Sequence, residues 1–97
     1  MGENFAKSTK IEPWNTVALT LSTANQTIKG TPGTAGYLSV NKGAAGATAA
    51  VYDGTVLIGT FALDNPMQFV FNRKCTVNLN VTLAGTLTTL DAIVGYR

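Results

Sequence analysis

A strict alternation of apolar and small polar residues over 75–83 restricts the fold of this chain more than any other feature. The apolar positions are Cys75, Val77, Leu79, Val81 and Leu83, and Thr or Asn lies between them. Because successive side chains of a strand point to opposite faces, the segment predicts a β-strand with one buried face. Apolar residues nowhere follow the i, i+3, i+4, i+7 spacing of an amphipathic helix, so an all-β fold is expected.

Similar segments, separated by turn residues, predict about seven strands in all. The expected strands cover residues 16–23, 37–41, 47–52, 55–63, 67–72, 75–83 and 86–96. Asp53-Gly54 predicts a two-residue type I′ hairpin turn, and Arg73-Lys74 is interpreted as a tight turn. The number and spacing of these strands predict an antiparallel β-sandwich, jelly-roll-like, over residues 16–97.

The first fifteen residues show no alternation and form a separate segment. Residues 1–15 hold four of the twelve charged residues and the only tryptophan, Trp14. We interpret this segment as an extended N-terminal arm that carries Phe5, Ile11 and Trp14 as candidate anchors to a partner. The alternative is an ordinary frayed terminus whose tryptophan plugs one end of the core.

The composition argues against most kinds of chemistry. The chain has no His and a single Cys, Cys75, which excludes His-based catalysis, an internal disulfide and the usual zinc sites. We therefore expect a non-enzymatic protein without cofactor or metal. A net charge of +2 is too weak for ordinary nucleic-acid binding. No apolar stretch approaches the ~20 residues of a membrane span, and the first residues lack the apolar core of a signal peptide.

Two other functions stay open as alternatives. A carbohydrate-binding or adhesin module would need exposed aromatic side chains on one face, whereas Phe69 and Phe71 share a phase within one strand and suit core packing better. An enzyme would need a deep pocket that holds at least two of the acids beyond the arm. Those acids are Asp53, Asp64 and Asp91.

Some expected strands are apolar on both faces. In a two-layer sandwich each sheet needs only one apolar face, so two-sided strands suggest a second buried surface. We therefore predict a homo-oligomer, with Leu57, Phe61, Leu87 and Ile93 as candidate interface residues. The alternative is that loops or the arm cover these positions.

Several short segments carry a family resemblance. They are Tyr37-Leu38-Ser39-Val40, Val51-Tyr52-Asp53-Gly54, Gly59-Thr60-Phe61, Phe69-Val70-Phe71, the alternating strand 75–83 and the closing 91–97. Together they cover residues 36–97, and the pattern resembles small β-sandwich virion proteins of tailed bacteriophages, of the capsid decoration or cement type. The closing segment has Asp91-Ala92 where the family pattern has the reverse order.

The resemblance implies an outer-shell protein of a virion. Such a protein is made in the host cytoplasm and binds neighbouring subunits of the major capsid protein, often as a homotrimer and sometimes through an N-terminal arm. A tail, fibre or head–tail joining component is the alternative within the virion. Low charge and uncharged Thr and Asn faces suit a protein that lies against other subunits.

Overall fold

Eight strands and no helix make up residues 14–97, the part of the chain that the computed structural model describes. Their bounds are β1 Asn15–Ala18, β2 Gln26–Lys29, β3 Gly33–Lys42, β4 Thr48–Asp53, β5 Val56–Ala62, β6 Met67–Cys75, β7 Leu79–Ala84 and β8 Asp91–Tyr96. The expected all-β fold is therefore confirmed, with one strand more than the sequence indicated.

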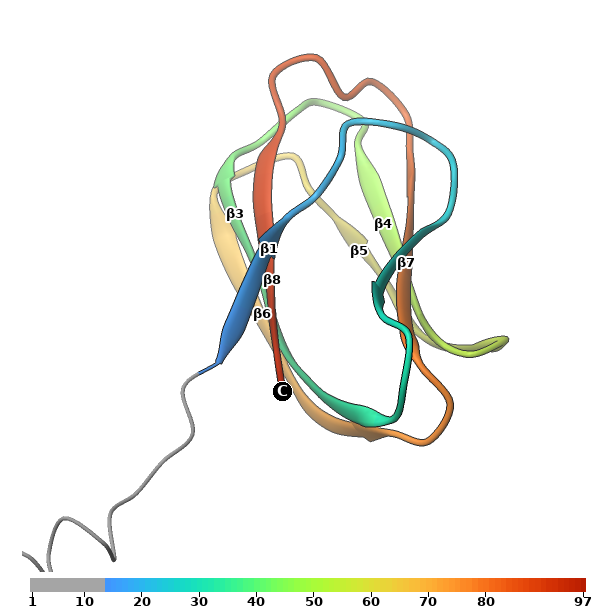
Figure 1. Cartoon of the computed structure of the whole chain (residues 1–97). Helices are drawn as coiled ribbons and strands as arrows, with labels where there is room; N and C mark the ends of the chain where they lie inside the picture. Colours follow the sequence, from blue (N-terminus) through green and yellow to red (C-terminus); the bar gives the residue numbers. More distant parts are fainter. Residues whose placement is uncertain (1–13) are drawn as a thin grey trace, which may run out of the picture.

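The strands form two antiparallel sheets of four, in the orders β1-β8-β3-β6 and β2-β7-β4-β5 (Figure 1). Only β4 and β5 are consecutive in the chain and also paired with each other. Every other connection between successive strands passes from one sheet to the other. The strand orders place β5 and β6 at the edges on one side of the molecule and β1 and β2 at the edges on the other.

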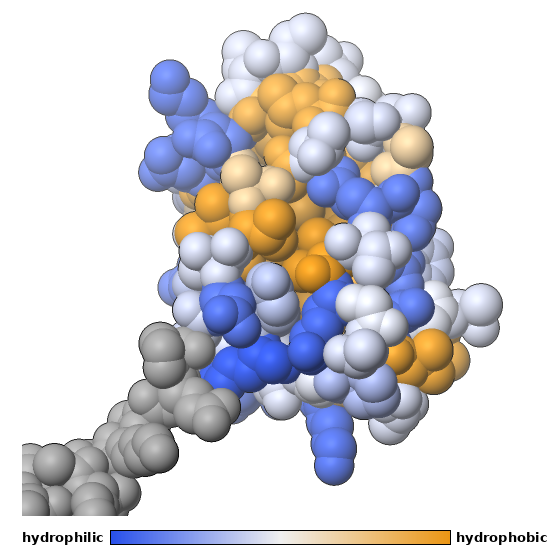
Figure 2. All heavy atoms as spheres, viewed as in Figure 1, coloured by the Kyte–Doolittle hydropathy of each residue, from blue (hydrophilic) through white to orange (hydrophobic). Residues whose placement is uncertain are grey.

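One apolar core lies between the two sheets, consistent with a β-sandwich, and apolar residues are visible in the middle of the face shown in Figure 2. In β4 the burial alternates strictly, so that Ala49 and Val51 face the core while Ala50 and Tyr52 face outward. The largest fully buried side chains come from both sheets and from the segment after β5. They are Leu38, Leu63, Leu79, Leu83, Val51, Val81, Val94 and Cys75.

The longest expected strand, 75–83, is interrupted in the structure. Cys75 ends β6 and Leu79 begins β7, so Thr76–Asn78 connect two strands in different sheets, and Val77 is 57% exposed. The expected turn at Arg73-Lys74 is also wrong, because both residues pair with β3. The chain turns after Cys75 because Asp53 accepts the backbone N–H groups of this connection. Side-chain alternation contains no information about such a distant acceptor.

Several other boundaries differ from the sequence expectation, and the strand expected at 37–41 covers Gly33–Lys42. The expected strand 16–23 ends at Ala18, and an unexpected strand, β2, follows it. The expected strand 86–96 begins only at Asp91, because the N–H of Leu90 donates to the carbonyl of Leu87 in a turn. Asn15, which the sequence assigned to the arm, pairs with Tyr96 in β8.

The hairpin between β4 and β5 is present, but its turn is shifted by one residue. Asp53 pairs with Val56, so the two loop residues are Gly54 and Thr55. Gly54 has a φ of 62°, whereas Thr55 has no positive φ. A type I′ turn needs positive φ at both loop residues, and a type II′ turn needs it at the first alone. The expected type I′ turn is therefore wrong, and this loop has the φ pattern of type II′.

Candidate functional site

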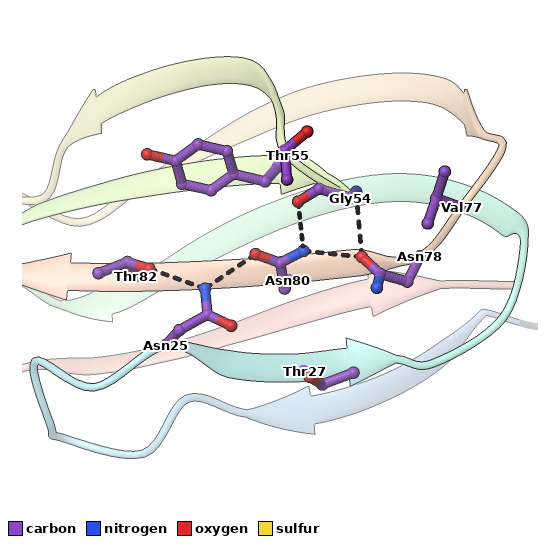
Figure 3. Close-up of a pocket in the computed structure, with 9 residues that line it drawn as sticks. Asn25, Thr27, Gly54, Thr55, Val77, Asn78, Asn80 and Thr82 are labelled. Carbon is purple, nitrogen blue, oxygen red and sulfur yellow. Dashed lines mark hydrogen bonds between the residues drawn. The ribbon is translucent and has the colours of Figure 1, made fainter.

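The outer face of the β2-β7-β4-β5 sheet carries an open hollow of about 610 Å³ beside the β4–β5 turn (Figure 3). Strand β7 crosses its floor, and the β4–β5 turn, the β6–β7 connection and the segment at β2 surround it. We call this feature the polar hollow. Its lining residues are Asn25, Thr27, Tyr52, Gly54, Thr55, Val77, Asn78, Asn80 and Thr82.

Asn80 is the central residue of the polar hollow. Its partners across the strands are Thr27 in β2 and Tyr52 in β4, and these neighbours leave only 7% of it exposed. A buried amide needs hydrogen-bond partners, because an unpaired one costs about 1–3 kcal/mol. The Nδ2 group of Asn80 donates to the Gly54 carbonyl at 3.2 Å and to Asn78 Oδ1 at 2.7 Å. Its Oδ1 accepts from Asn25 Nδ2 at 2.8 Å.

The hydrogen bonds extend from Asn80 to both ends of the polar hollow. Asn25 Nδ2 also donates to Thr82 Oγ1 at 2.8 Å, and the Gly54 N–H donates to Asn78 Oδ1 at 3.0 Å. Three asparagine side chains, one just before β2, one just before β7 and one within β7, are thereby held in fixed orientations (Figure 3). The floor of the hollow is consequently prearranged.

Asp53 fixes the β6–β7 connection beside the polar hollow. Its Oδ2 accepts the N–H of Thr76 at 2.8 Å, and its Oδ1 accepts the N–H groups of Val77 at 2.9 Å and Asn78 at 3.3 Å. Hydrogen bonds to the ionised carboxylate favour that form. The backbone N–H groups of Thr76 and Val77 therefore lower the pKa of Asp53, against a smaller opposing effect of desolvation.

A second candidate surface is the side of the molecule formed by the two edge strands β5 and β6. Phe61 of β5 contacts Phe69 and Phe71 of β6, with ring centroids 4.9 and 5.1 Å away, so the two edges meet through aromatic packing. Four further apolar side chains of these strands are between 49% and 71% exposed: Val56, Leu57, Met67 and Val70. We call these seven residues, whose side chains point to more than one face of the two edge strands, the β5–β6 side.

The predicted interface residues do not gather on one surface. Leu57 and Phe61 both lie on β5, but Leu57 pairs with the outward-facing Tyr52 and Phe61 pairs with the buried Ala49, so their side chains point to opposite faces. Leu87 lies in the connection between β7 and β8 and packs against the core. Ile93 is half-buried on β8, an inner strand, where it pairs with Ala18 of β1 and Ser39 of β3 in the same sheet, away from the β5–β6 side. Burial against the core accounts for Leu87, and the oligomer itself stays a prediction.

Trp14 neither plugs the core nor stands alone. Its ring lies edge-on to Tyr37, with centroids 6.1 Å apart, and the Arg97 guanidinium lies 3.8 Å above it. A Cβ atom at Gly36 would lie 2.6 Å from the indole, so glycine there permits this close approach. Phe5 and Ile11, the other predicted anchors, lie outside the described residues.

The acids and the cysteine occupy separate environments. Asp64 and Asp91 are exposed, Asp91 accepts from Asn41 Nδ2 at 3.1 Å, and none of the three Asp residues beyond the arm lines the polar hollow. Cys75 is buried, and desolvation together with the charge of Asp53 raises the pKa of its thiol. Within residues 14–97, no three His, Cys, Asp or Glu side chains cluster as metal ligands would.

The polar hollow was not predicted from the sequence. Asn78 and Asn80 were recognised as the polar face of a strand, but their partner Asn25 precedes a strand, β2, that was not expected. The one available signal was the polar alternation itself, which placed Asn80 on an outer face. Nothing in it showed that two neighbouring strands would nearly enclose the amide.

Comparison with known proteins adds no relative: no family model, no curated protein and no solved structure matches the chain. Of the segments that the structure describes, none is a helix with the length and apolar character to span a membrane.

Proposed function

We propose that this chain is a non-enzymatic structural protein of a phage virion, which decorates or cements the capsid by binding neighbouring subunits of the major capsid protein. It acts on the capsid surface as a homotrimer, without cofactor, nucleic acid or membrane. The fold we propose is an eight-stranded jelly roll, supported by the strand orders β1-β8-β3-β6 and β2-β7-β4-β5.

The observation that carries this proposal is the apolar, uncharged character of the β5–β6 side. Edge strands of monomeric proteins are normally protected by charged side chains, because their free N–H and C=O groups otherwise pair with other chains. Strand β5 contains no charged residue, and in β6 the only charges, Arg73 and Lys74, lie near its end. An edge of this kind suits permanent contact with another subunit, which stabilises by about 25 cal/mol per Å² of apolar surface covered.

Repetition strengthens such contacts. On a capsid lattice each copy of a trimer meets an equivalent partner, so weak individual contacts add up through a high effective concentration. A surface with little charge and a modest apolar area is sufficient under these conditions. A tail, fibre or head–tail joining component uses the same kind of surface, and the position in the particle distinguishes these proposals.

Cryo-electron microscopy of the particle tests the proposal. We expect density for this chain outside the capsid floor, in groups of three. Density in the tail or at the head–tail joint would support the alternative virion role instead. Absence of the chain from purified particles would contradict both.

Deletion of residues 1–13 tests the arm. Trp14 is retained, because its contacts with Tyr37 and Arg97 belong to the described structure. We expect the truncated chain to keep its circular dichroism spectrum and melting temperature while its retention on capsids in a pelleting assay falls. Substitution of Lys7 and Lys10 by Ala in the full-length chain is the control for charge alone. Equal retention of the truncated and full-length chains would exclude the arm as an anchor.

A further inference from the structure

We propose that the polar hollow binds a neutral carbohydrate, one or two pyranose units at the end of a glycan. This role is separate from capsid attachment, which we assign to the β5–β6 side and the arm. The lining supplies three things that a neutral sugar requires: uncharged polar groups, fixed orientations and apolar surface for the C–H faces of the ring.

The absence of charge from the lining selects the class of ligand. The nine lining residues comprise amides, hydroxyls, one phenol, a glycine and a valine. The nearest carboxylate, that of Asp53, is occupied by the N–H groups of the β6–β7 connection. An anionic ligand such as a phosphate would find no cation among these residues, and a cation would find no carboxylate. A ligand recognised through many neutral hydroxyls fits this lining.

The hydrogen-bond network leaves particular atoms available for such hydroxyls. Asn25 uses its Nδ2 within the network, and Asn78 uses its Oδ1. Among the described residues, no partner is recorded for Asn25 Oδ1 or for Asn78 Nδ2. The network therefore presents an acceptor at one end and a donor at the other, both held in place. A sugar hydroxyl both donates and accepts, so it complements either group.

Hydroxyl and apolar groups complete the lining. Thr27 and Thr55 lie on opposite sides of the hollow in Figure 3, and both are exposed. Tyr52 lies beside Asn80 on the neighbouring strand and adds one aromatic ring that ends in a hydroxyl. This is less than the exposed aromatic face of a dedicated carbohydrate-binding module, so recognition here depends mainly on the amides and hydroxyls. Such a ring joins apolar surface to a polar group, and Val77 adds further apolar surface. The hollow of about 610 Å³ lies within the size range of small-molecule sites.

Titration of the ¹⁵N-labelled full chain with neutral sugars tests this site by NMR. The probes are methyl α-glucopyranoside, methyl α-mannopyranoside, methyl β-galactopyranoside and N-acetylglucosamine, each to roughly 100 mM, because open sites with few contacts bind in the millimolar range. We expect at least one sugar to shift the backbone amides of Thr27, Gly54 and Thr55. The side-chain amides of Asn25 and Asn78 should shift with the same saturation curve.

Matched threonine variants give the specificity of the response. Thr55→Val removes one hydroxyl from the lining, and Thr60→Val removes one from an exposed position of β5 that does not line the hollow. Thr55→Val should raise the dissociation constant about 2- to 10-fold, as expected for one lost hydrogen bond, and Thr60→Val should leave it unchanged. The amide spectra show directly whether each variant is folded.

Three results would overturn the proposal. The first is no saturable shift with any of the four sugars. The second is a shift confined to another face of the chain. The third is equal affinity in Thr55→Val, in Asn25→Ala and in the parent chain. Glucose 6-phosphate serves as a charged comparison, and tighter binding of it than of methyl α-glucopyranoside would also contradict a neutral site.

Discussion

At the scale of single residues, Asp53 is important for the fold, because its one carboxylate accepts hydrogen bonds from the whole connection between β6 and β7, which lie in different sheets. The alternation of 75–83 predicted one continuous strand, but Asp53 accepts the N–H groups of Thr76, Val77 and Asn78 and the strand is interrupted there. A type I′ Asp-Gly turn, inferred from the sequence, assigns Asp53 only a local role. Its contact lies more than twenty residues away in the chain, so no local pattern contains it.

The ionised form of Asp53 should make stability depend on pH. Its pKa is lower in the folded chain than in the unfolded chain, so ionisation favours folding. This contribution is complete above about pH 4 and is lost as the pH falls through the folded-state pKa. We expect Asp53→Asn to lower the melting temperature at pH 7 and to reduce the difference between pH 7 and pH 2.5. Thermal unfolding followed by circular dichroism measures both effects.

Asp64→Asn is the control for that experiment. Asp64 is exposed, and no hydrogen bond to its side chain is found within residues 14–97. Its substitution should leave the melting temperature at pH 7 close to that of the parent chain. If both variants melted alike at every pH, the carboxylate of Asp53 would not be what holds the connection.

At the scale of elements, β7 shows which features of a strand its sequence pattern predicts and which it does not. The inward positions Leu79, Val81 and Leu83 were predicted and are buried, because alternation determines which face of a strand is apolar. The neighbours of β7 are β2 and β4, and this pairing depends on chain crossings between sheets. The network of Asn80 follows from that pairing, so it could not be predicted from either strand alone.

We predict that Asn80→Ala destabilises the fold by about 1–3 kcal/mol. The change removes the donor to Gly54 and Asn78 and leaves Asn25 without one of its acceptors. Urea unfolding measures the free energy. Asn41→Ala is the matched control, since Asn41 is exposed and makes one side-chain hydrogen bond, to Asp91. A loss no larger at Asn80 than at Asn41 would mean that the network adds nothing to stability.

At the scale of the whole molecule, the presence of apolar residues on both faces of an expected strand predicted exposed apolar surface only in part. It identified Leu57 and Phe61, which lie on the β5–β6 side, but also Leu87, which packs against the core. Counting apolar residues on both faces of an expected strand fails where the strand is really a loop. Leu87 is such a case, because β8 begins only at Asp91.

We predict that the chain sediments as an oligomer at tens of micromolar and that Val70→Lys weakens its association at least about tenfold, or about 1.4 kcal/mol. Val70 is 71% exposed, so the lysine is easily accommodated in an isolated subunit, whereas at an interface it would bring a charge into an apolar contact. Leu21→Lys, at an exposed apolar residue between β1 and β2, is the control and should not change sedimentation. A monomeric parent chain would rule out self-association through the β5–β6 side.

The contact between Trp14 and Arg97 allows the intrinsic tryptophan fluorescence of the chain to report on this one place. Trp14 is the only tryptophan, and it contacts the edge-on ring of Tyr37 and the guanidinium of Arg97 at the junction with residues 1–13. Fluorescence excited at the red edge of its absorption therefore comes from this one place. A partner that rearranges the junction should shift that emission without any attached dye, while a ligand in the polar hollow of the opposite sheet should leave it unchanged.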